Sequence, residues 1–343
     1  VPTPINKKKQ PDLTHLKDVC NKLSKIIKKK DIIIFESTVY PGLTNDFCIP
    51  LIEKNNNFKE GVDFYVGYSP ERVNPGDKIH SLKNINKILA YPHNYLKKEL
   101  IKVYSLISKK IILSNNIRET ETAKVIENIQ RDVNIGLINE FYLVCKRLNL
   151  DFNNVINLAS SKWNFIKFKP GLVGGHCIGV DPYYLTHKAK GLGYHAQIIN
   201  SGRAVNDSMG AYVGRTVAKK VIAAGTSMQE ARMLVMGATF KEDVSDIRNS
   251  KVVDVINELK SFSCNVEVVD PHADSDELYA EYGFKLVDNP TGKYHSIIVA
   301  VNHTEYTFLK ESDYKSMLSE KGILVDLKGI YRNKIKELNY WTL

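Results

Sequence analysis

The chain has 343 residues, of which 43% are hydrophobic and 25% are charged, and its formal net charge is +10. Because one hydrophobic core usually stops growing at about 250 to 300 residues, we expect two or more packed units. The composition excludes a disordered, collagen-like or low-complexity chain, and no apolar run approaches the roughly 18 residues that span a bilayer.

The first 30 residues carry most of the positive charge. They contain nine Lys and two Asp, which together account for +7 of the +10. Apolar residues recur there at helical spacing from Leu13 to Ile27, so the Lys side chains are interpreted as the solvated face of a helix. No aromatic residue interleaves these Lys, and we therefore predict neither a nucleic-acid partner nor a membrane partner.

The five cysteines indicate a reducing compartment. Their number is odd and no CxxC pair occurs, which fits neither a disulfide framework nor a zinc site. Together with a Lys-rich start that has no apolar leader segment, this pattern predicts a cytoplasmic protein without a metal.

Short apolar runs alternate with helical patterns through the first 117 residues, which is typical of an α/β unit. Residues 119–148 lack Pro and carry apolar residues every three or four positions, so they predict one long amphipathic helix that connects two lobes and carries a dimer contact. A Gly-rich loop follows at 170–182, then a helix through 212–223, then a second α/β unit with a parallel sheet. The predicted strands are 31–35, 64–67, 87–90, 110–113, 233–236, 266–269, 296–301 and 323–325, and a further helix is predicted at 250–259.

One dinucleotide-binding pattern is rejected. The segment from Gly191 to Ala196 fits G-x-G-x-x-A, but that fingerprint requires a preceding apolar strand, whereas the preceding residues are polar and helix-like. We interpret the segment as a helix C-cap followed by a Gly turn. The segment from Gly237 to Lys241 follows a strand but has one Gly, so the sequence contains no complete phosphate-binding fingerprint.

Cys177 lies in the strongest chemical motif, the Gly-rich segment from Gly171 to Pro182. The glycines of this segment permit close backbone approach to a ligand, His176 precedes the cysteine, and Asp181 follows four residues later. The motif fits a thiolate nucleophile, and spacing alone leaves a structural role equally open. The other four cysteines are interpreted as inert core residues.

Two further groups of polar residues are candidates for a ligand site. Lys124, Asn128 and Arg131 share one face of the long helix beside apolar residues, which favours a position near a lobe junction over a solvated stripe. Glu71 follows a predicted strand, at the edge where α/β sheets bind ligands, although a surface turn explains that segment nearly as well.

Six motifs occur in one order along the whole chain, and together they resemble the UDP-glucose/GDP-mannose dehydrogenase family. Each motif is weak alone, but six in sequence are a specific signal. The form of residues 170–185 resembles the bacterial enzymes that act on UDP-N-acetylglucosamine or UDP-N-acetylgalactosamine and supply uronic acids for capsules and O-antigens. The six motifs are residues 1–4, 36–42, 69–76, 121–128, 174–182 and 237–248.

The resemblance implies three domains and an NAD-dependent oxidation of C6 of the sugar to a carboxylate. The implied fold is α/β, with a Rossmann-like NAD domain at 1–117, a central helical dimerisation domain at 118–205 and a Rossmann-like UDP-sugar-binding domain at 206–343. NAD as the cofactor, a UDP-sugar as the substrate and a homodimer through the central helix follow from the same resemblance.

The implied chemistry centres on Cys177. By the resemblance, its thiol adds to the aldehyde that a first hydride transfer forms, a second hydride transfer gives a thioester, and water releases the acid. Lys124 and Asn128 would stabilise the oxyanion and order the water. The residues implied for proton transfer and for contacts with the hydrolytic water are Asp181, Glu71 and Thr38.

The resemblance also implies binding residues at both ligands. Arg203 is implied at the substrate across a dimer interface, and a surface helix charge is an equally good interpretation of it. The other residues implied at the substrate are Arg72, Lys167, Lys169, Gly171, Gly174, Phe240, Lys241 and Lys328. The residues implied at NAD are Pro2, Thr3, Ser37, Thr38, Val39 and Arg248.

Two departures from the family pattern bear on the activity. The UDP-glucose branch has a second Glu where this chain has Pro75, which favours the N-acetylhexosamine branch. The segment at Val1 normally follows the fourth strand of the NAD domain, so we expect roughly 80 to 100 residues with the Gly-rich turn, its helix and the ribose-binding acid to be missing. NAD turnover by this chain is then expected to be weak.

The leading prediction is a UDP-N-acetylhexosamine 6-dehydrogenase. The alternatives are a UDP-glucose 6-dehydrogenase and a non-catalytic sugar-nucleotide-binding protein. Pure binding would not require Lys124, Asn128, Cys177, Asp181 and Lys241 together.

Overall fold

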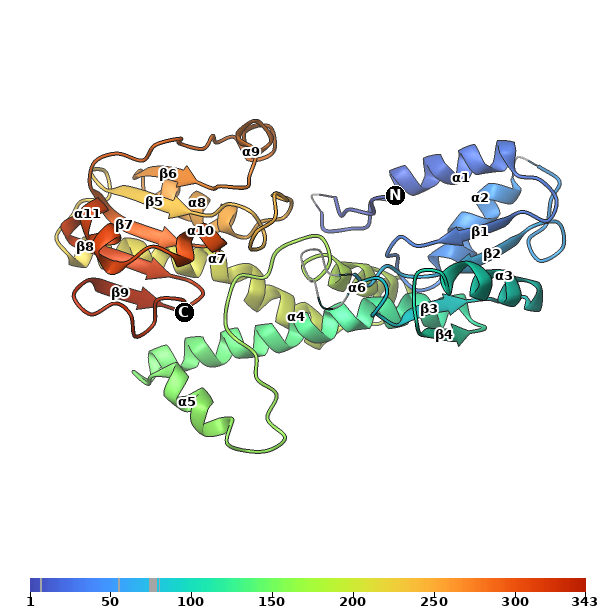
Figure 1. Cartoon of the computed structure of the whole chain (residues 1–343), viewed down its shortest axis with the longest axis horizontal. Coiled ribbons are helices and arrows are strands. Elements are labelled where there is room, and N and C mark those ends of the chain that lie inside the picture. The colour runs from blue at the N-terminus through green and yellow to red at the C-terminus, as the bar shows by residue number, and fades with distance from the viewer. Residues whose placement is uncertain (7, 55, 74–78, 80) are drawn as a thin grey trace. The chain divides into compact units, whose positions relative to one another are not determined.

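The computed structural model describes residues 1–343 except 7, 55, 74–78 and 80 (Figure 1). The chain forms two compact units. The first unit contains residues 1–131 and 180–200, and the second contains residues 132–179 and 201–343. Among the helices of the described residues, none has both the length and the apolar character that crossing a membrane requires.

The first unit contains a four-stranded sheet in the order β1-β2-β3-β4. The pairs β1/β2 and β3/β4 are parallel, and β2 meets β3 antiparallel at Tyr68 and Ala90. All four strands coincide with predicted runs. The elements are α1 (Thr14–Ile26), β1 (Ile32–Phe35), the π-helical η1 (Thr44–Cys48), α2 (Ile49–Glu53), β2 (Tyr65–Tyr68), β3 (Lys87–Ala90), α3 (Asn94–Tyr104), β4 (Ile111–Ser114), the start of α4 (Ile117–Arg147) and α6 (Asp181–Gly191).

Alternate side chains of β1 face opposite helices, as a strand of period two requires. Ile33 packs in the cluster that contains Leu16 of α1, whereas Ile34 packs in the cluster that contains Leu100 of α3. The Lys-rich first helix is thus anchored by its apolar stripe, and most of its Lys side chains stay at the surface. This confirms the predicted amphipathic arrangement.

The second unit contains a parallel five-stranded sheet in the order β6-β5-β7-β8-β9, as predicted for this half of the chain. The sequence patterns did not predict β9 or the short helices α10 and α11. The elements are α5 (Phe152–Ala159), most of α7 (Gln197–Ala223), β5 (Arg232–Met236), α8 (Val252–Ser261), β6 (Asn265–Val269), α9 (Ser275–Tyr282), β7 (Tyr294–Val299), α10 (Thr304–Thr307), α11 (Glu311–Met317), β8 (Leu318–Asp326) and β9 (Asn339–Thr342).

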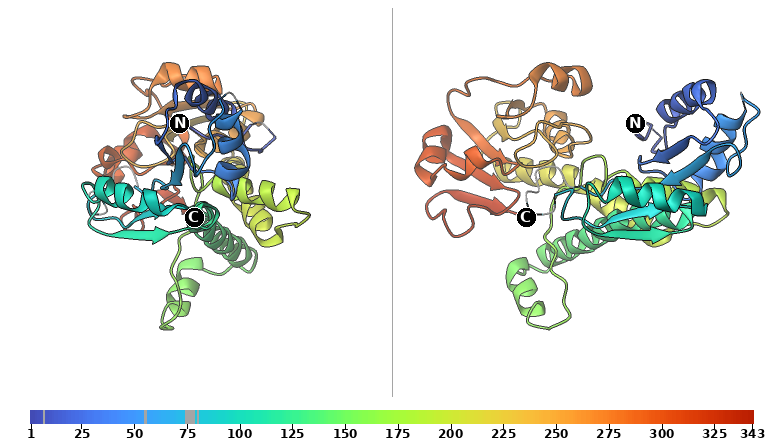
Figure 2. Two further views of the ribbon diagram at one scale, coloured as in Figure 1. Left: turned by 90° about the vertical axis from the view of Figure 1, so that its right-hand side faces the viewer. Right: turned by 45° about the vertical axis from the view of Figure 1, so that its right-hand side comes forward.

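Both faces of this second sheet are covered (Figure 2). Met233 and Val235 of β5 pack in one core cluster with residues of α7 and α8, whereas Leu234 and Met236 pack in the opposite cluster. Buried on both faces, these strands read as continuous apolar runs, which is why the sequence predicted them well.

The apolar stripe predicted on the long helix is buried only in its first part. Val125 and Ile129 of α4 are buried, in agreement with the pattern. Four later members of the stripe remain exposed, and other α4 residues, including Tyr142, enter the core of the second unit. The exposed members are Leu137 (45%), Phe141 (42%), Val144 (45%) and Leu148 (61%).

The Gly-rich loop ends slightly earlier than predicted, because Asp181 and Pro182 begin α6. Pro is well suited to the first turn of a helix, where its missing N–H costs no hydrogen bond. At the other end α6 finishes at Gly191, and Gly193 has a φ of 76°. The rejected dinucleotide pattern is therefore the helix end and Gly turn that we predicted.

Candidate active site

Lys124, Asn128 and Asp181 form a buried polar cluster in the first unit. The Nδ2 of Asn128 donates a hydrogen bond to Oδ2 of Asp181 at 2.6 Å. Burial raises the pKa of Asp181 to about 7, although the hydrogen bond from Asn128 and the charge of Lys124 act in the opposite direction. Arg131, the third predicted member of this helix face, is exposed instead. The cluster thus holds a carboxyl group poised to exchange a proton near neutral pH.

Glu121 lies one helical turn before Lys124 and anchors a loop. Its fully buried carboxylate accepts the backbone N–H of Gly42 at 2.6 Å and that of Thr44 at 3.0 Å. Burial raises the pKa of this carboxyl group against the effect of these donors. Gly42 has a φ of 91°, a conformation that favours glycine. Glu121 lies in the motif at residues 121–128, but no role was predicted for it from the sequence.

The residues implied at NAD from the two N-terminal motifs lie together. The hydroxyl of Thr3 donates a hydrogen bond to the carbonyl oxygen of Thr38 at 2.8 Å. The hydroxyl of Ser37 donates to the carbonyl oxygen of Val1 at 2.8 Å. Both motifs therefore meet just beyond the carboxyl end of β1, where α/β sheets bind nucleotides. The side chain of Val39 is buried in the core, so only its backbone could face a ligand.

Glu71 shares a buried lysine with a second carboxylate. The Nζ of Lys87 lies 3.6 Å from Oε2 of Glu71 and 3.4 Å from Oε1 of Glu36. Burial alone would raise the pKa of Glu71, but the N–H of Val73 and the charge of Lys87 hold it below its usual value. Glu71 is therefore a carboxylate at neutral pH. Lys87 was missed because its partners are 16 and 51 residues away in the chain.

Arg72 is held close to Glu71 by a different carboxylate. Its guanidinium forms a bidentate pair with Glu127 of α4, with N···O distances of 3.1 and 2.7 Å, and donates to the carbonyl oxygen of Asn86. The branch-specific position Pro75 falls in the stretch 74–78, outside the described residues.

The loop that carries Cys177 belongs to the second unit, and its glycines are required by close packing. A Cβ at Gly174 would lie 2.5 Å from the carbonyl oxygen of Asn249, and a Cβ at Gly175 would lie 2.7 Å from the ring of Phe240. Cys177 itself is exposed, whereas the other four cysteines are buried, as predicted. The tight loop thus presents one accessible thiol.

Several residues implied at the ligands surround this loop within the second unit. The ring of His176 packs edge-on against Phe240 at 5.5 Å between centroids, and its Nδ1 lies 3.4 Å from Oδ2 of Asp246. Asp246 in turn binds Arg248 through two hydrogen bonds of 2.9 and 2.6 Å. Burial lowers the pKa of His176, so its neutral form is favoured. The remaining basic residues implied at the substrate comprise exposed Lys167 and Lys169, half-buried Lys241, and Lys328, whose Nζ lies 3.2 Å from Glu242.

A buried polar network connects the start of this loop to two helices. The side-chain amide of Asn139 donates to the carbonyl oxygen of Gly171 at 3.0 Å and accepts the Gly171 N–H at 2.9 Å. The same amide donates to Asn206 of α7 at 2.8 Å, and Asn206 donates to Oδ1 of Asp132 at 2.8 Å. The network ties the Cys177 loop to both α4 and α7.

Arg203 closes this network, and its interpretation as a surface helix charge is wrong. The side chain is 3% exposed, with one nitrogen 2.5 Å from Asp132 and another 2.5 Å from Asp207. Two carboxylates thus bind its guanidinium within one chain. The implied substrate contact stays a prediction.

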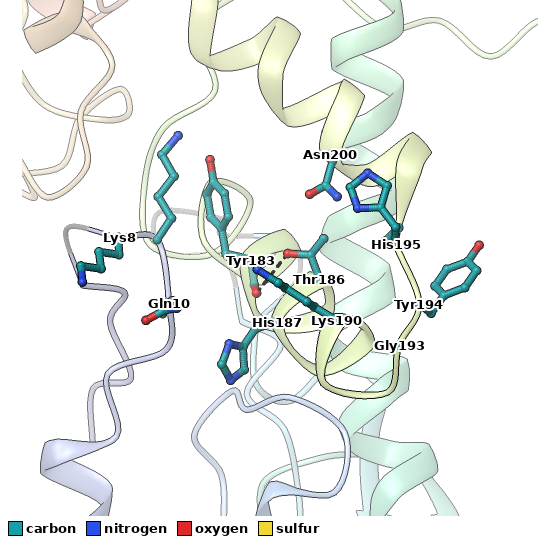
Figure 3. A pocket seen from close by; sticks show the side chains of 12 residues that line it. Lys8, Gln10, Tyr183, Thr186, His187, Lys190, Gly193, Tyr194, His195 and Asn200 are labelled. Atoms are coloured by element: carbon teal, nitrogen blue, oxygen red, sulfur yellow. Dashed lines mark hydrogen bonds between the residues drawn. The ribbon is translucent and has the colours of Figure 1, made fainter.

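A cavity of the first unit lies elsewhere, beside α6 (Figure 3). Its volume is about 650 Å³, and among the described residues its lining contains no carboxylate. None of the residues implied for catalysis lines it. Its basic lining residues are Lys8, Lys9, His187, Lys190 and His195.

Three domain families match consecutive parts of the chain. They are described as the UDP-glucose/GDP-mannose dehydrogenase family NAD binding domain (residues 1–108), central domain (118–208) and UDP binding domain (234–333). A UDP-N-acetyl-D-glucosamine 6-dehydrogenase from Salmonella typhi is 46% identical over 332 residues, which cover 96% of this chain and 78% of that protein. The chain belongs to the UDP-glucose/GDP-mannose dehydrogenase family, which confirms the resemblance.

Two further similarities agree with this membership. Protein CapL from Staphylococcus aureus is 44% identical over 341 residues, which cover 99% of this chain and 80% of that protein. The solved structure of a UDP-D-ManNAc dehydrogenase from Pyrococcus horikoshii matches with a TM-score of 0.87 and 27% identity, over 99% of this chain and 78% of that one.

The comparisons do not bear out one expectation. We expected the first part of the NAD domain to be missing, but the family's NAD binding domain matches residues 1–108. The expectation of weak NAD turnover, which followed from it, is withdrawn.

Because Arg203 is buried and paired, we expect its substitution to cause a large loss of stability. Arg203→Met leaves Asp132 as an uncompensated buried charge, and we expect the free energy of unfolding to fall by about 3 to 5 kcal/mol in urea titrations. Arg215→Met on the same helix removes an ion pair whose Arg side chain is 52% exposed, and should cost at most about 1 kcal/mol. Adding Asp132→Leu to Arg203→Met should recover part of the loss. Equal effects of the two single variants would contradict the structural role of the network.

Proposed function

We propose that this protein oxidises C6 of a UDP-N-acetylhexosamine, first of all UDP-N-acetyl-D-glucosamine, to the uronic acid with NAD. Family membership and the activity for which the Salmonella typhi relative is named support the proposal. The structural observation that carries it is the buried cluster of Lys124, Asn128 and Asp181, which supplies a cation, an amide donor and a carboxyl group together. UDP-glucose oxidation is less supported, because the Salmonella typhi relative at 46% identity is a dehydrogenase of an N-acetylated sugar.

Cys177 is proposed as the nucleophile. NAD, when bound, accepts the hydride in each of the two oxidations. The thiolate of Cys177 forms a C–S bond to the aldehyde carbon, and this covalent link keeps the intermediate from escaping before the second oxidation. Cys177 precedes Asp181 by four residues in the chain. Lys124 and Asn128 are proposed to stabilise the negative charge that develops on the substrate oxygen, an effect worth several kcal/mol where water is excluded.

Hydrolysis of the thioester requires a base. Water attacks the thioester carbon, the C–S bond breaks to release the Cys177 thiolate, and the proton of the water is proposed to pass to Asp181. A carboxylate whose pKa is about 7 binds that proton more strongly than an ordinary aspartate would. Glu71, with its lowered pKa, is proposed as an accessory proton acceptor and Thr38 as a donor to the water.

Residues of the first unit fit a nicotinamide dinucleotide. Pro2, Thr3, Ser37 and Thr38 lie together beyond the carboxyl end of β1 and expose hydroxyl and backbone groups there. Arg248, whose side chain is 61% exposed, is proposed as a further contact to the anionic cofactor. The expected domain boundaries, the cytoplasmic location and the use of the product in surface polysaccharides stay predictions.

We also propose a homodimer through α4. Leu137, Phe141, Val144 and Leu148 recur every three or four residues and leave one apolar face of the second unit exposed. Such a contiguous face on a helix is typical of an interface, and the self-complementary occupant is a second copy of this chain.

The first test compares substrates and the nucleophile. With NAD, we expect two NADH for each uronic acid from UDP-N-acetyl-D-glucosamine, with kcat/KM higher than for UDP-glucose. Cys177→Ser should lower acid formation by about a thousandfold or more. Cys264→Ser is the matched control, because its hydroxyl can keep the bond that the thiol makes to the carbonyl oxygen of Leu259. Sugar-nucleotide binding in calorimetry without any NADH formation would instead favour a non-catalytic binding protein.

The second test is the pH dependence of acid formation. Because the pKa of Asp181 is about 7, its basic form grows as the pH rises from about 6 to about 8, and the rate of thioester hydrolysis should rise with it. Asp181→Asn should lower the rate and remove this rise. Asp46→Asn serves as the control, since the pKa of Asp46 is already below its usual value. An unchanged pH profile in Asp181→Asn would remove Asp181 from the mechanism.

The third test concerns assembly. We expect light scattering to give twice the chain mass of 38.9 kDa, and the double variant Phe141→Glu/Val144→Glu to give a monomer. Leu158→Glu changes an exposed leucine on α5, outside this face, and should leave the mass unchanged. A parent protein that stays monomeric at micromolar concentration would overturn the dimer.

A further inference from the structure

Three loops of the second unit bring two histidines and an aspartate together, outside the proposed catalytic residues. Asp243 follows β5, His272 follows β6 and His303 follows β7. These strands are neighbours in the sheet order β6-β5-β7 and run parallel. Their carboxyl ends therefore share one edge, the edge at which α/β sheets place ligand-binding groups.

The donor atoms of these residues lie close to one another. The Nε2 of His272 and the Nδ1 of His303 are each 3.8 Å from Oδ1 of Asp243, and all three atoms fall within 4.8 Å. The carboxylate of Glu305 adds a fourth group, with Oε1 3.3 Å from the Nε2 of His272. Donors bound to one zinc ion at about 2.0 to 2.2 Å lie roughly 3 to 3.5 Å apart, so a closure of about 1 Å assembles the site.

His303 has the orientation of a metal-binding imidazole. Its Nδ1 accepts the backbone N–H of Asp243 at 3.1 Å, so that nitrogen is unprotonated and the ring proton is on Nε2. The Nε2 faces the buried carboxylate of Asp270 at 3.0 Å. A carboxylate behind a histidine fixes its tautomer and raises its basicity toward a metal. The lone pair of Nδ1 is directed at Asp243, another member of the cluster, and is engaged there by the backbone N–H.

Asp270 and Thr304 hold the other groups of the cluster in place. Asp270 accepts the backbone N–H of His272 at 2.8 Å, which ties both histidines to one carboxylate. Thr304 donates its N–H and its hydroxyl to the two carboxylate oxygens of Asp243 at 2.8 and 2.7 Å. Each carboxylate oxygen keeps a further lone pair for a cation. For Nδ1 of His303 to bind a metal ion, its hydrogen bond with the Asp243 N–H must break, and this cost limits the affinity for the ion.

We propose that Asp243, His272 and His303 bind a divalent transition-metal ion of the zinc class, with Glu305 as the fourth ligand. A donor set of two imidazoles with carboxylates binds ions of this class in preference to magnesium or calcium. The bound ion links the three loops that follow β5, β6 and β7 and so stabilises the second unit. The site uses histidines that are dispersed in the sequence, so the absence of paired cysteines does not bear on it.

The test is a zinc titration of the Cys177→Ser protein, in which the exposed thiol can no longer bind the metal. Calorimetry should show one saturable zinc ion per chain, and zinc should raise Tm in a way that a chelator reverses. His272→Ala, at a side chain that is 30% exposed, should weaken binding at least about tenfold. His272→Phe keeps a ring beside His303 but has no ring nitrogen, and should behave in the same way.

His15→Ala is the matched control, since it removes an exposed histidine of α1 in the first unit. It should leave both the zinc affinity and the zinc-dependent rise in Tm unchanged. Zinc binding that survives both His272 variants at full affinity, or a parent protein with no saturable binding, would overturn the site. Neither outcome depends on the dehydrogenase activity.

Discussion

The crossing of α4 and α7 in the second unit is the constraint on which the candidate active site depends. The helices approach so closely at Gly136 and Gly202 that a Cβ at Gly136 would lie 2.9 Å from the Gly202 carbonyl oxygen. Beside these glycines the helices bury charged and amide side chains, which must be paired because an unpaired buried polar group costs several kcal/mol. Asp132 pairs with Arg203, and the amides of Asn139 and Asn206 pair with each other. Asn139 also binds the backbone of the loop that carries Cys177.

In the first unit, buried polar side chains on the earlier turns of α4 are likewise paired with groups of other segments. Glu121 binds the backbone of the loop that follows β1, and Asn128 binds Asp181 at the start of α6. One long helix thus presents buried polar side chains that bind other segments, since Glu121 holds a loop and Asn128 holds the first residue of α6. A proton-exchanging carboxyl group and an accessible thiol, each fixed by α4 within its own unit, are what the proposed chemistry requires.

Much of the fold could be predicted because its signals are local. The strands of the second sheet are buried on both faces and read as apolar runs, and the long helix shows an unbroken period. Lys124, Asn128 and Cys177 could be chosen as candidates because their motifs are contiguous. Arg203 was open to misinterpretation because its burial depends on Asp132, which lies 71 residues earlier in the chain.

By itself the sequence determined most of the elements and their order, the α/β class, the family and the Gly-rich loop around Cys177, since each of these rests on residues that are near neighbours in the chain. Only the tertiary structure decided which charged groups are buried and with which partners. It placed Lys87 between Glu36 and Glu71, raised the pKa of Asp181, and gathered His272 and His303 around Asp243. Burial and ionisation depend on the groups that folding brings together from distant segments, and no local pattern encodes those contacts.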